Sequence, residues 1–171
     1  NMNNILTING SNSSVSIHLE LINILINKYN APIDLLPIRE NQIQLYDRDV
    51  NVEGIPAEIT MIFNAIKDRK TLLITSPEHN GFFTSYLKAI LDWLSRVEMK
   101  FLADKKIFIL GTSSGRGGAA GSIDSLSQLV KRLGATEVVS LSIPSWGHIS
   151  NEEGDFIPEV DEKIKHFISQ F

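Results

Sequence analysis

The stretch Thr71–Arg96 constrains the fold more than any other part of the sequence. It begins with a short apolar run, breaks at Ser76–Pro77, continues through a polar loop that contains Gly81, and ends in an amphipathic run. This pattern predicts a buried strand, a loop at its carboxyl end and a helix that returns along the sheet. Ligands of open parallel sheets bind beyond the carboxyl ends of the strands, so residues 76–84 are the first candidate for a ligand-binding wall.

Short apolar runs and amphipathic runs alternate along the rest of the chain as well. Further strands are predicted at residues 4–9, 31–38, 106–110 and 137–143, and further helices at 15–29, 56–68, 119–133 and 160–171. The polar segment at 39–55 is expected to form an irregular loop.

This alternation predicts the fold class. Strands rich in isoleucine, leucine and valine on both faces indicate a parallel sheet with helices on each side, which is a doubly wound α/β fold. The length of 171 residues suits the flavodoxin-like arrangement, a three-layer sandwich around a five-stranded parallel sheet in the order 2-1-3-4-5. All of residues 1–171 are expected to form one domain.

The composition excludes several function classes. A formal net charge of −4 without a lysine or arginine run gives no support for binding nucleic acid or a membrane surface. The absence of cysteine excludes disulfides, a thiolate nucleophile and cysteine-ligated metals. The four histidines lack metal-ligand spacing, so no metal is expected. Without a secretory signal or a membrane span, the expected location is the cytoplasm.

The first loop with the residues for ligand binding is Gly10–Ser14, between a predicted strand and a predicted helix. A helix N-terminus presents free amides and a partial positive charge, which suit a phosphate group. The alternative is a turn without a ligand, in which Ser13 or Ser14 caps the helix.

Two more loops follow predicted strands. Residues 76–84 end in Phe82 and Phe83, and such rings beside backbone amides could bind a planar ligand edge-on. Residues 112–118 are the most glycine-rich part of the chain. Residues 115–120 of this region also fit the GxGxxA pattern of dinucleotide-binding proteins. That pattern normally follows the first strand, whereas here it follows the fourth. A flexible loop that a ligand approaches closely is therefore the better interpretation.

The segment SPEHNGFFTSYLKAILDWLSR resembles the SPEYN…LKNALDWLSR signature of the NADPH-dependent FMN reductases. This flavodoxin-like family includes quinone, azo-dye and chromate reductases. The segment that begins at Gly10–Ser11 resembles the family's GSxRxxSxN phosphate loop, and GTSSGRGGAAGS resembles its glycine-rich loop. The resemblance extends along nearly the whole chain.

The resemblance implies an FMN site built from three loops. The phosphate would bind at Ser11, Ser13, Ser16 and His18, the isoalloxazine ring would lie along Pro77, Glu78, His79, Asn80 and Gly81, and Ser113, Ser114, Gly115 and Gly118 would close the other side. The family's phosphate-loop arginine is replaced here by Ser13, and its asparagine by His18. The helix amides and His18 would therefore have to compensate for the missing charge.

The resemblance also implies the reaction and the assembly. NADPH or NADH would pass a hydride to the flavin, and the flavin would reduce a small acceptor such as a quinone, an azo compound, free flavin or a metal oxyanion. Such chemistry needs no acid–base side chains, and no catalytic residue is assigned. A homodimer or homotetramer is implied, with the helix after residues 76–84 at the interface and Phe82, Phe83 and Trp93 as exposed aromatic residues.

Two other functions fit the same fold. A flavodoxin-like electron-transfer carrier would share the cofactor, although such carriers are usually more acidic than a net charge of −4. A flavin-free binding domain would result if the cofactor had been lost together with the phosphate-loop arginine.

Overall fold

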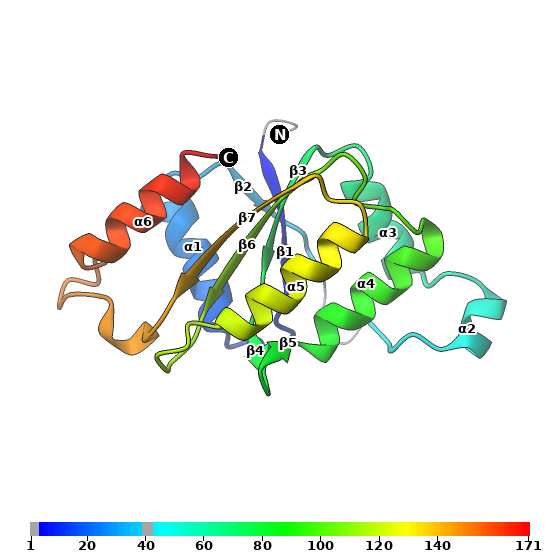
Figure 1. Ribbon diagram of the computed structural model, residues 1–171, viewed down its shortest axis with the longest axis horizontal. Coiled ribbons are helices and arrows are strands. Elements are labelled where there is room, and N and C mark those ends of the chain that lie inside the picture. The colour runs from blue at the N-terminus through cyan, green and yellow to red at the C-terminus, as the bar shows by residue number, and fades with distance from the viewer. Residues whose placement is uncertain (1–3, 39–42) are drawn as a thin grey trace.

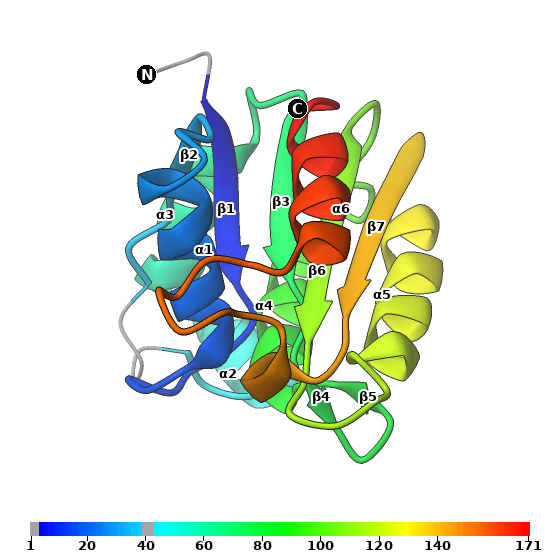
Figure 2. The ribbon, with the colours of Figure 1, turned by 90° about the vertical axis from the view of Figure 1, so that its left-hand side faces the viewer.

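The structure, a computed structural model, describes residues 4–38 and 43–171. Its centre is a five-stranded parallel sheet with the strand order β2-β1-β3-β6-β7 (Figures 1 and 2). The strands are β1 (Ile5–Asn9), β2 (Ile33–Leu35), β3 (Thr71–Thr75), β6 (Lys106–Thr112) and β7 (Glu137–Ile143). This order confirms the predicted flavodoxin-like topology.

Helices cover both faces of the sheet (Figure 1). One layer consists of α1 (Ile17–Asn27) and α6 (Pro158–Ile168), and the other of α3 (Ala57–Ile66), α4 (Ser85–Val97) and α5 (Ala120–Arg132). Alternate strand residues serve the two layers: Leu73 packs with α1 and α6, while Leu72 and Ile74 pack with the other three helices. All three are at most 1% exposed, as expected of a central parallel strand.

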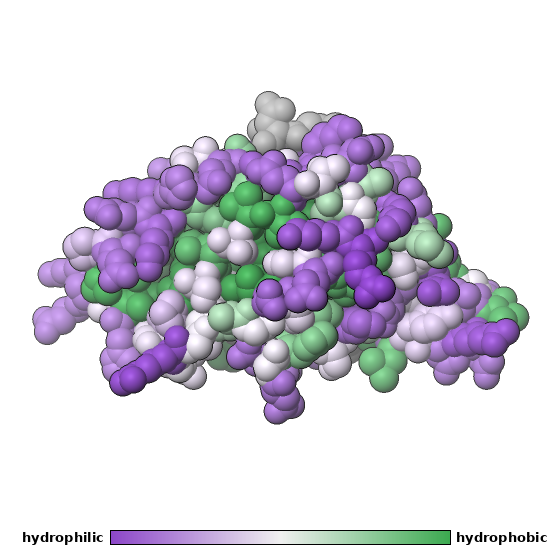
Figure 3. Space-filling model, in the orientation of Figure 1, coloured by the Kyte–Doolittle hydropathy of each residue, from purple (hydrophilic) through white to green (hydrophobic). Residues whose placement is uncertain are grey.

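β7 is an edge strand and is the least covered strand of the sheet. Val138, Val139 and Leu141 are only partly buried. Figure 3, in the orientation of Figure 1, shows apolar surface along this edge between the more hydrophilic helices on either side.

The segment expected to be irregular contains a short helix, α2 (Arg48–Glu53). The Asp47 side chain accepts a hydrogen bond from the Asp49 N–H at 2.7 Å and so caps the helix. No residue of α2 is buried, which explains why no apolar periodicity indicated it. Residues 39–42 of the expected loop lie outside the described residues.

The loop expected after β3 is a β-hairpin of β4 (Glu78–His79) and β5 (Phe82–Phe83). Asn80 and Gly81 have φ values of 54° and 79°, as a type I′ hairpin turn requires. Asn-Gly is the favoured sequence for that turn, so the sequence carried the signal for this hairpin.

The prediction that three aromatic residues near α4 are exposed is wrong for two of them. Trp93 is fully buried and its indole N–H donates to the Gln44 carbonyl at 2.9 Å, while Phe83 is 5% exposed. The apolar residues of α4 face the sheet. Of the three aromatic residues, only Phe82 on β5, at 52% exposure, lies on the surface. Across the described chain, no helix has the length and apolar character needed to cross a membrane.

Candidate functional site

Four loops meet at the carboxyl edge of the sheet (Figure 2). They follow β1, β3, β6 and β7, and the last of them contains the short 3₁₀ helix η1 (Trp146–His148). Every site residue predicted from the sequence lies on the first three loops or in the first turn of α1. The strand topology therefore brings the predicted residues to one edge of the molecule, where open α/β sheets bind their ligands.

Gly10 begins the first loop in a position that excludes any side chain. Its N–H donates to the Thr75 hydroxyl at 3.0 Å, and its carbonyl accepts from the Thr84 hydroxyl at 2.6 Å. A Cβ atom at Gly10 would lie 2.3 Å from the Thr75 carbonyl oxygen. The end of β1 is thereby fixed against the end of β3 and the start of α4.

The serines of the first loop organise its backbone. The Ser11 hydroxyl accepts from the Ser13 N–H at 3.2 Å. The Ser13 hydroxyl donates to the Val15 carbonyl at 2.8 Å and accepts from the Val15 N–H at 3.2 Å. The helix cap is Ser16, whose hydroxyl accepts from the Leu19 N–H at 3.3 Å. The expectation that Ser13 or Ser14 caps the helix is wrong, because α1 begins two residues later than predicted.

The first turn of α1 keeps most of its N–H groups available. Four N–H groups lack intrahelical partners at the start of any α-helix, and the Ser16 side chain satisfies one of them. Among the described residues, no other side-chain cap is recorded for this turn. Ser13 beside it is exposed. The loop and the helix together therefore offer hydroxyl and amide donors to an anion.

His18 lies behind this loop, and it does not supply the charge that the sequence suggested. It is 3% exposed, and its Nε2 accepts a hydrogen bond from the Thr112 N–H at 3.1 Å. Because Nε2 is an acceptor, the proton of the neutral ring is on Nδ1. Burial lowers the pKa of His18 to about 4, so the ring is neutral at pH 7. Its role is to join the first turn of α1 to the end of β6.

The hairpin forms the second wall of the site. His79, Asn80 and Gly81 at its tip are exposed. The Glu78 side chain instead turns toward α5, where Oε1 accepts from the Ser122 N–H at 2.9 Å. The backbone of the turn, rather than the Glu78 carboxylate, therefore faces away from the protein body.

The third wall is the glycine-rich loop, which is anchored at both ends. The Ser113 hydroxyl donates to the Gly115 carbonyl at 3.0 Å and accepts from the Gly118 N–H at 2.9 Å. Gly118 has a φ of 58°, and a Cβ atom there would lie 2.4 Å from the Ser142 hydroxyl. Ser114 and Gly115 between these anchors are exposed, and a Cβ atom at Gly115 would meet nothing within 4 Å.

The loop after β7 supports the glycine-rich loop from outside. Ser145 N–H donates to the Gly115 carbonyl at 2.8 Å, and Trp146 N–H donates to the Ser113 carbonyl at 2.9 Å. The Trp146 ring packs edge-on against Phe156, with centroids 6.2 Å apart. This loop thus links the glycine-rich loop to the far end of α1.

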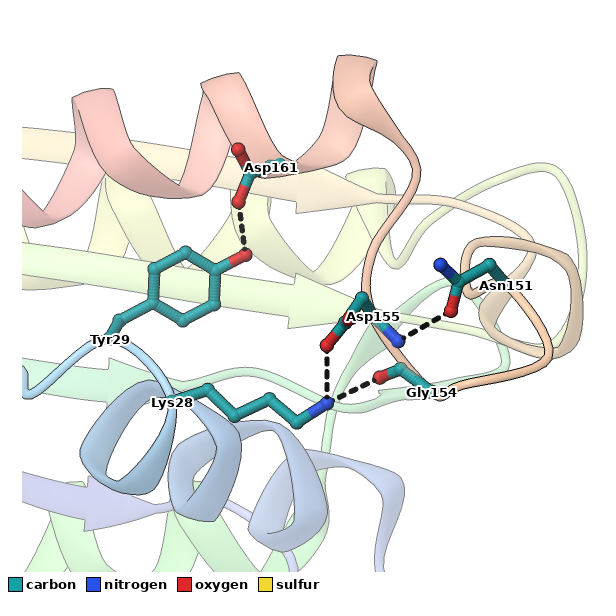
Figure 4. Close-up of polar contacts among 6 residues, drawn as sticks. All are labelled: Lys28, Tyr29, Asn151, Gly154, Asp155 and Asp161. Carbon is teal, nitrogen blue, oxygen red and sulfur yellow. Dashed lines mark hydrogen bonds and ion pairs between the residues drawn. The ribbon is translucent and has the colours of Figure 1, made fainter.

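Two side chains, those of Lys28 and Tyr29, fasten that far end (Figure 4). The Lys28 ammonium binds the Asp155 carboxylate and the Gly154 carbonyl, both at 2.8 Å, and the Tyr29 hydroxyl donates to Asp161 at 2.7 Å. Burial and the neighbouring Asp161 carboxylate raise the pKa of Tyr29, so the hydroxyl keeps its proton and remains a donor. The hydrogen bond from Tyr29 to Asp161 therefore persists near neutral pH.

The family model of the NADPH-dependent FMN reductases matches residues 3–147 of this sequence. The chain belongs to this family.

Two relatives and a solved structure are similar to this chain. The chain is 31% identical over 131 residues to an NAD(P)H-dependent FMN reductase of Pseudomonas aeruginosa, a match that covers 75% of this chain and 69% of the relative. It is also 31% identical over 86 residues to an uncharacterized protein of Mycoplasma pneumoniae, where the match spans 50% of this chain and 51% of that protein. The flavoenzyme NAD(P)H:(acceptor) oxidoreductase of Paracoccus denitrificans has the same fold, with a TM-score of 0.76, 20% identity and coverage of 97% and 95% of the two chains.

The donor groups of these loops fit an FMN molecule. The cradle of serine hydroxyls and first-turn amides fits a phosphate, and the two exposed backbone segments, at the hairpin turn and at Gly115, fit the polar edge of a planar ring. Among the described residues, no group of three or more His, Asp or Glu side chains lies close enough to hold a metal ion.

Several residues that build the site were not predicted from the sequence. Asn9, Thr75 and Thr112 each end a strand, and their side chains fasten the loops: the Thr75 hydroxyl donates to the Asn9 side-chain oxygen at 2.7 Å, and the Thr112 hydroxyl donates to the Ile143 carbonyl at 2.7 Å. Small polar residues at the last position of three neighbouring strands were a visible signal. Ser122 carried none, because its partners are 44 and 46 residues away.

Proposed function

We propose that the protein holds FMN at the carboxyl edge of the sheet and uses it to reduce a small acceptor with NAD(P)H. The phosphate is assigned to Ser11, Ser13, Ser16 and the first-turn amides of α1, and the ring to residues 77–81 on one side and to Ser113, Ser114, Gly115 and Gly118 on the other. The observation that carries the proposal is that the serine loop and the available N-terminus of α1 lie at the same sheet edge as the two exposed backbone segments.

The side chains of the site bind and orient rather than exchange protons. FMN, when bound, supplies the redox chemistry by taking electrons from the nicotinamide and giving them to the acceptor. The protein contributes hydroxyl and amide donors in fixed positions, with His18 acting from behind the loop through Thr112 rather than on the phosphate. Quinones, azo compounds, free flavin and metal oxyanions are the proposed acceptors.

The spectrum of the purified protein tests this function. The protein is mixed with FMN, freed of excess flavin, and treated with NADPH under anaerobic conditions. We expect a retained flavin whose visible absorbance disappears on reduction, and parallel lines in steady-state kinetics. A retained flavin that neither NADPH nor NADH reduces would contradict the reductase and favour the electron carrier. Failure to bind FMN in a direct titration would favour the flavin-free binding domain.

We also propose that two copies associate beside α4, and that the protein works in the cytoplasm, where NADPH is available. An open groove of about 500 Å³ lies between the hairpin, α4 and α5, and exposed Phe82 stands at its end. We assign Phe82 to the interface because its exposed ring would be buried against a second copy of the chain. Light scattering should give the mass of an oligomer for the natural protein and of a monomer for Phe82→Glu. Unchanged mass in this variant would contradict the assigned interface.

A further inference from the structure

We propose that Glu78 and Ser122 are positioning residues that fix the hairpin for the cofactor, so that the Glu78 carboxylate acts on α5 and not on the flavin. The inference rests on the proposed flavin site and gives it a mechanism of pre-organisation. The hairpin has two strands of only two residues each and an exposed tip, and so short a hairpin is not stable by itself. Its position must therefore come from contacts with the rest of the protein.

The first contact is the hydrogen bond from the Ser122 N–H to Glu78 Oε1 at 2.9 Å. The residue before α5 is Ala119, which has a left-handed φ of 60° and provides no side-chain cap. Glu78 therefore caps α5 from another element of the chain. A carboxylate is well placed there, because the N-terminus of a helix carries a partial positive charge.

The second contact joins Ser122 to the residue that begins the loop. The Ser122 hydroxyl lies 2.7 Å from the Ser76 carbonyl, 3.1 Å from the Ala119 carbonyl and 3.0 Å from the Ser76 hydroxyl. One hydroxyl has a single proton, so Ser122 donates to a carbonyl, of which that of Ser76 is the nearer, and accepts from the Ser76 hydroxyl. Both serines are fully buried, and water cannot replace these bonds. Ser122 thus holds the loop at residue 76 and again at Glu78.

The third contact is a close approach at Gly121. A Cβ atom there would lie 2.7 Å from Glu78 Oε1 and 2.8 Å from the Gly81 carbonyl oxygen. The first atom belongs to a movable side chain, but the second belongs to the turn backbone and can move only with the hairpin. The start of α5 therefore touches both ends of the segment assigned to the flavin ring.

The test measures FMN affinity and hydrogen exchange in four variants of the full chain. Glu78→Ala removes the acceptor of the Ser122 N–H, and Ser122→Ala keeps that N–H but removes the hydroxyl bonds to Ser76. Each should weaken FMN binding roughly tenfold, because the loop is then less firmly fixed before binding. Glu78→Gln should restore affinity to within about threefold, since its amide oxygen still accepts from the Ser122 N–H. The control is Glu162→Ala, which removes an exposed carboxylate from α6, away from the hairpin, and should change neither measurement.

Hydrogen exchange of residues 76–84 is measured without FMN, so it does not depend on the proposed function. Faster exchange of this segment in Glu78→Ala, and natural exchange in Glu78→Gln, would support the positioning role even if FMN did not bind. Unchanged exchange and affinity in Glu78→Ala would overturn it. Weak FMN binding by Glu78→Gln, with natural exchange, would also overturn it, because the carboxylate would then contact the cofactor directly.

Discussion

Helices α1 and α5 begin at the same edge of the sheet, yet their N-termini differ in what they face. The start of α5 already receives the Glu78 carboxylate and is packed against the hairpin. The start of α1 has one side-chain cap, from Ser16, and lies beside an exposed serine loop. Both ends carry the same partial positive charge, but only that of α1 remains for an external anion. The difference supports the assignment of the phosphate to α1 and of a structural role to the start of α5.

The comparison predicts that a carboxylate placed at the N-terminus of α1 would occupy that end of the helix, as Glu78 occupies the N-terminus of α5, and would exclude the phosphate. Ser13→Asp should weaken FMN binding about a thousandfold, because a unit charge about 4 Å from the phosphate costs about 4 kcal/mol near a protein surface. Fluorescence titration of FMN measures the change. Asn23→Asp adds the same charge to an exposed position farther along α1 and should leave the affinity within a few-fold of the natural value. Equal losses in both variants would mean that net charge, not this loop, controls binding.

The neutral His18 predicts how the start of α1 responds to acid. Its pKa is 6.5 in the unfolded chain and about 4 in the folded one, so the unfolded chain takes up the proton first. The free energy of unfolding should therefore fall by about 3 kcal/mol from this residue alone as the pH falls from above 6.5 to 4, and rise again with pH.

Denaturant titrations at several pH values measure this loss in the natural protein and in His18→Gln. The glutamine cannot titrate, but its carbonyl can still accept from the Thr112 N–H. The variant should lack the His18 part of the pH dependence. An identical pH profile in both proteins would refute a neutral, buried His18.

A smaller gain is expected from the opposite change at the loop. Ser13→Arg restores the arginine of the family's phosphate loop and should tighten FMN binding about tenfold, since a charge-assisted hydrogen bond to a phosphate contributes about 1.5 kcal/mol or more. Isothermal titration calorimetry measures the gain, and high salt should reduce it. An affinity that does not change would show that the phosphate lies out of reach of residue 13.

The sequence allowed the sheet and its helices to be predicted because each strand is buried on both faces. Residues such as Leu72, Leu73 and Ile74 form continuous apolar runs for that reason. Helix α2 gave no such pattern, since it has no buried residue and is capped locally by Asp47. Packing against the sheet is readable in a sequence, whereas local hydrogen bonding on the surface is much less so.

The site could be predicted only where its residues act locally. Serines at 11, 13 and 16 were identified through the resemblance to the family's phosphate loop, although the cap was assigned to the wrong one of several similar serines. The roles of His18 and Glu78 depend on Thr112 and Ser122, which are 94 and 44 residues away. No spacing within the sequence can reveal such pairs, because the fold alone brings them together.

The most direct test of the central claim compares FMN with riboflavin, which lacks the phosphate. We predict that the natural protein binds FMN at least about a hundredfold more tightly, and that Ser13→Asp abolishes or reverses this preference while leaving riboflavin affinity nearly unchanged. Both affinities come from the same fluorescence titration. Equal affinity for the two flavins in the natural protein would contradict the claim that the N-terminus of α1 is the phosphate site.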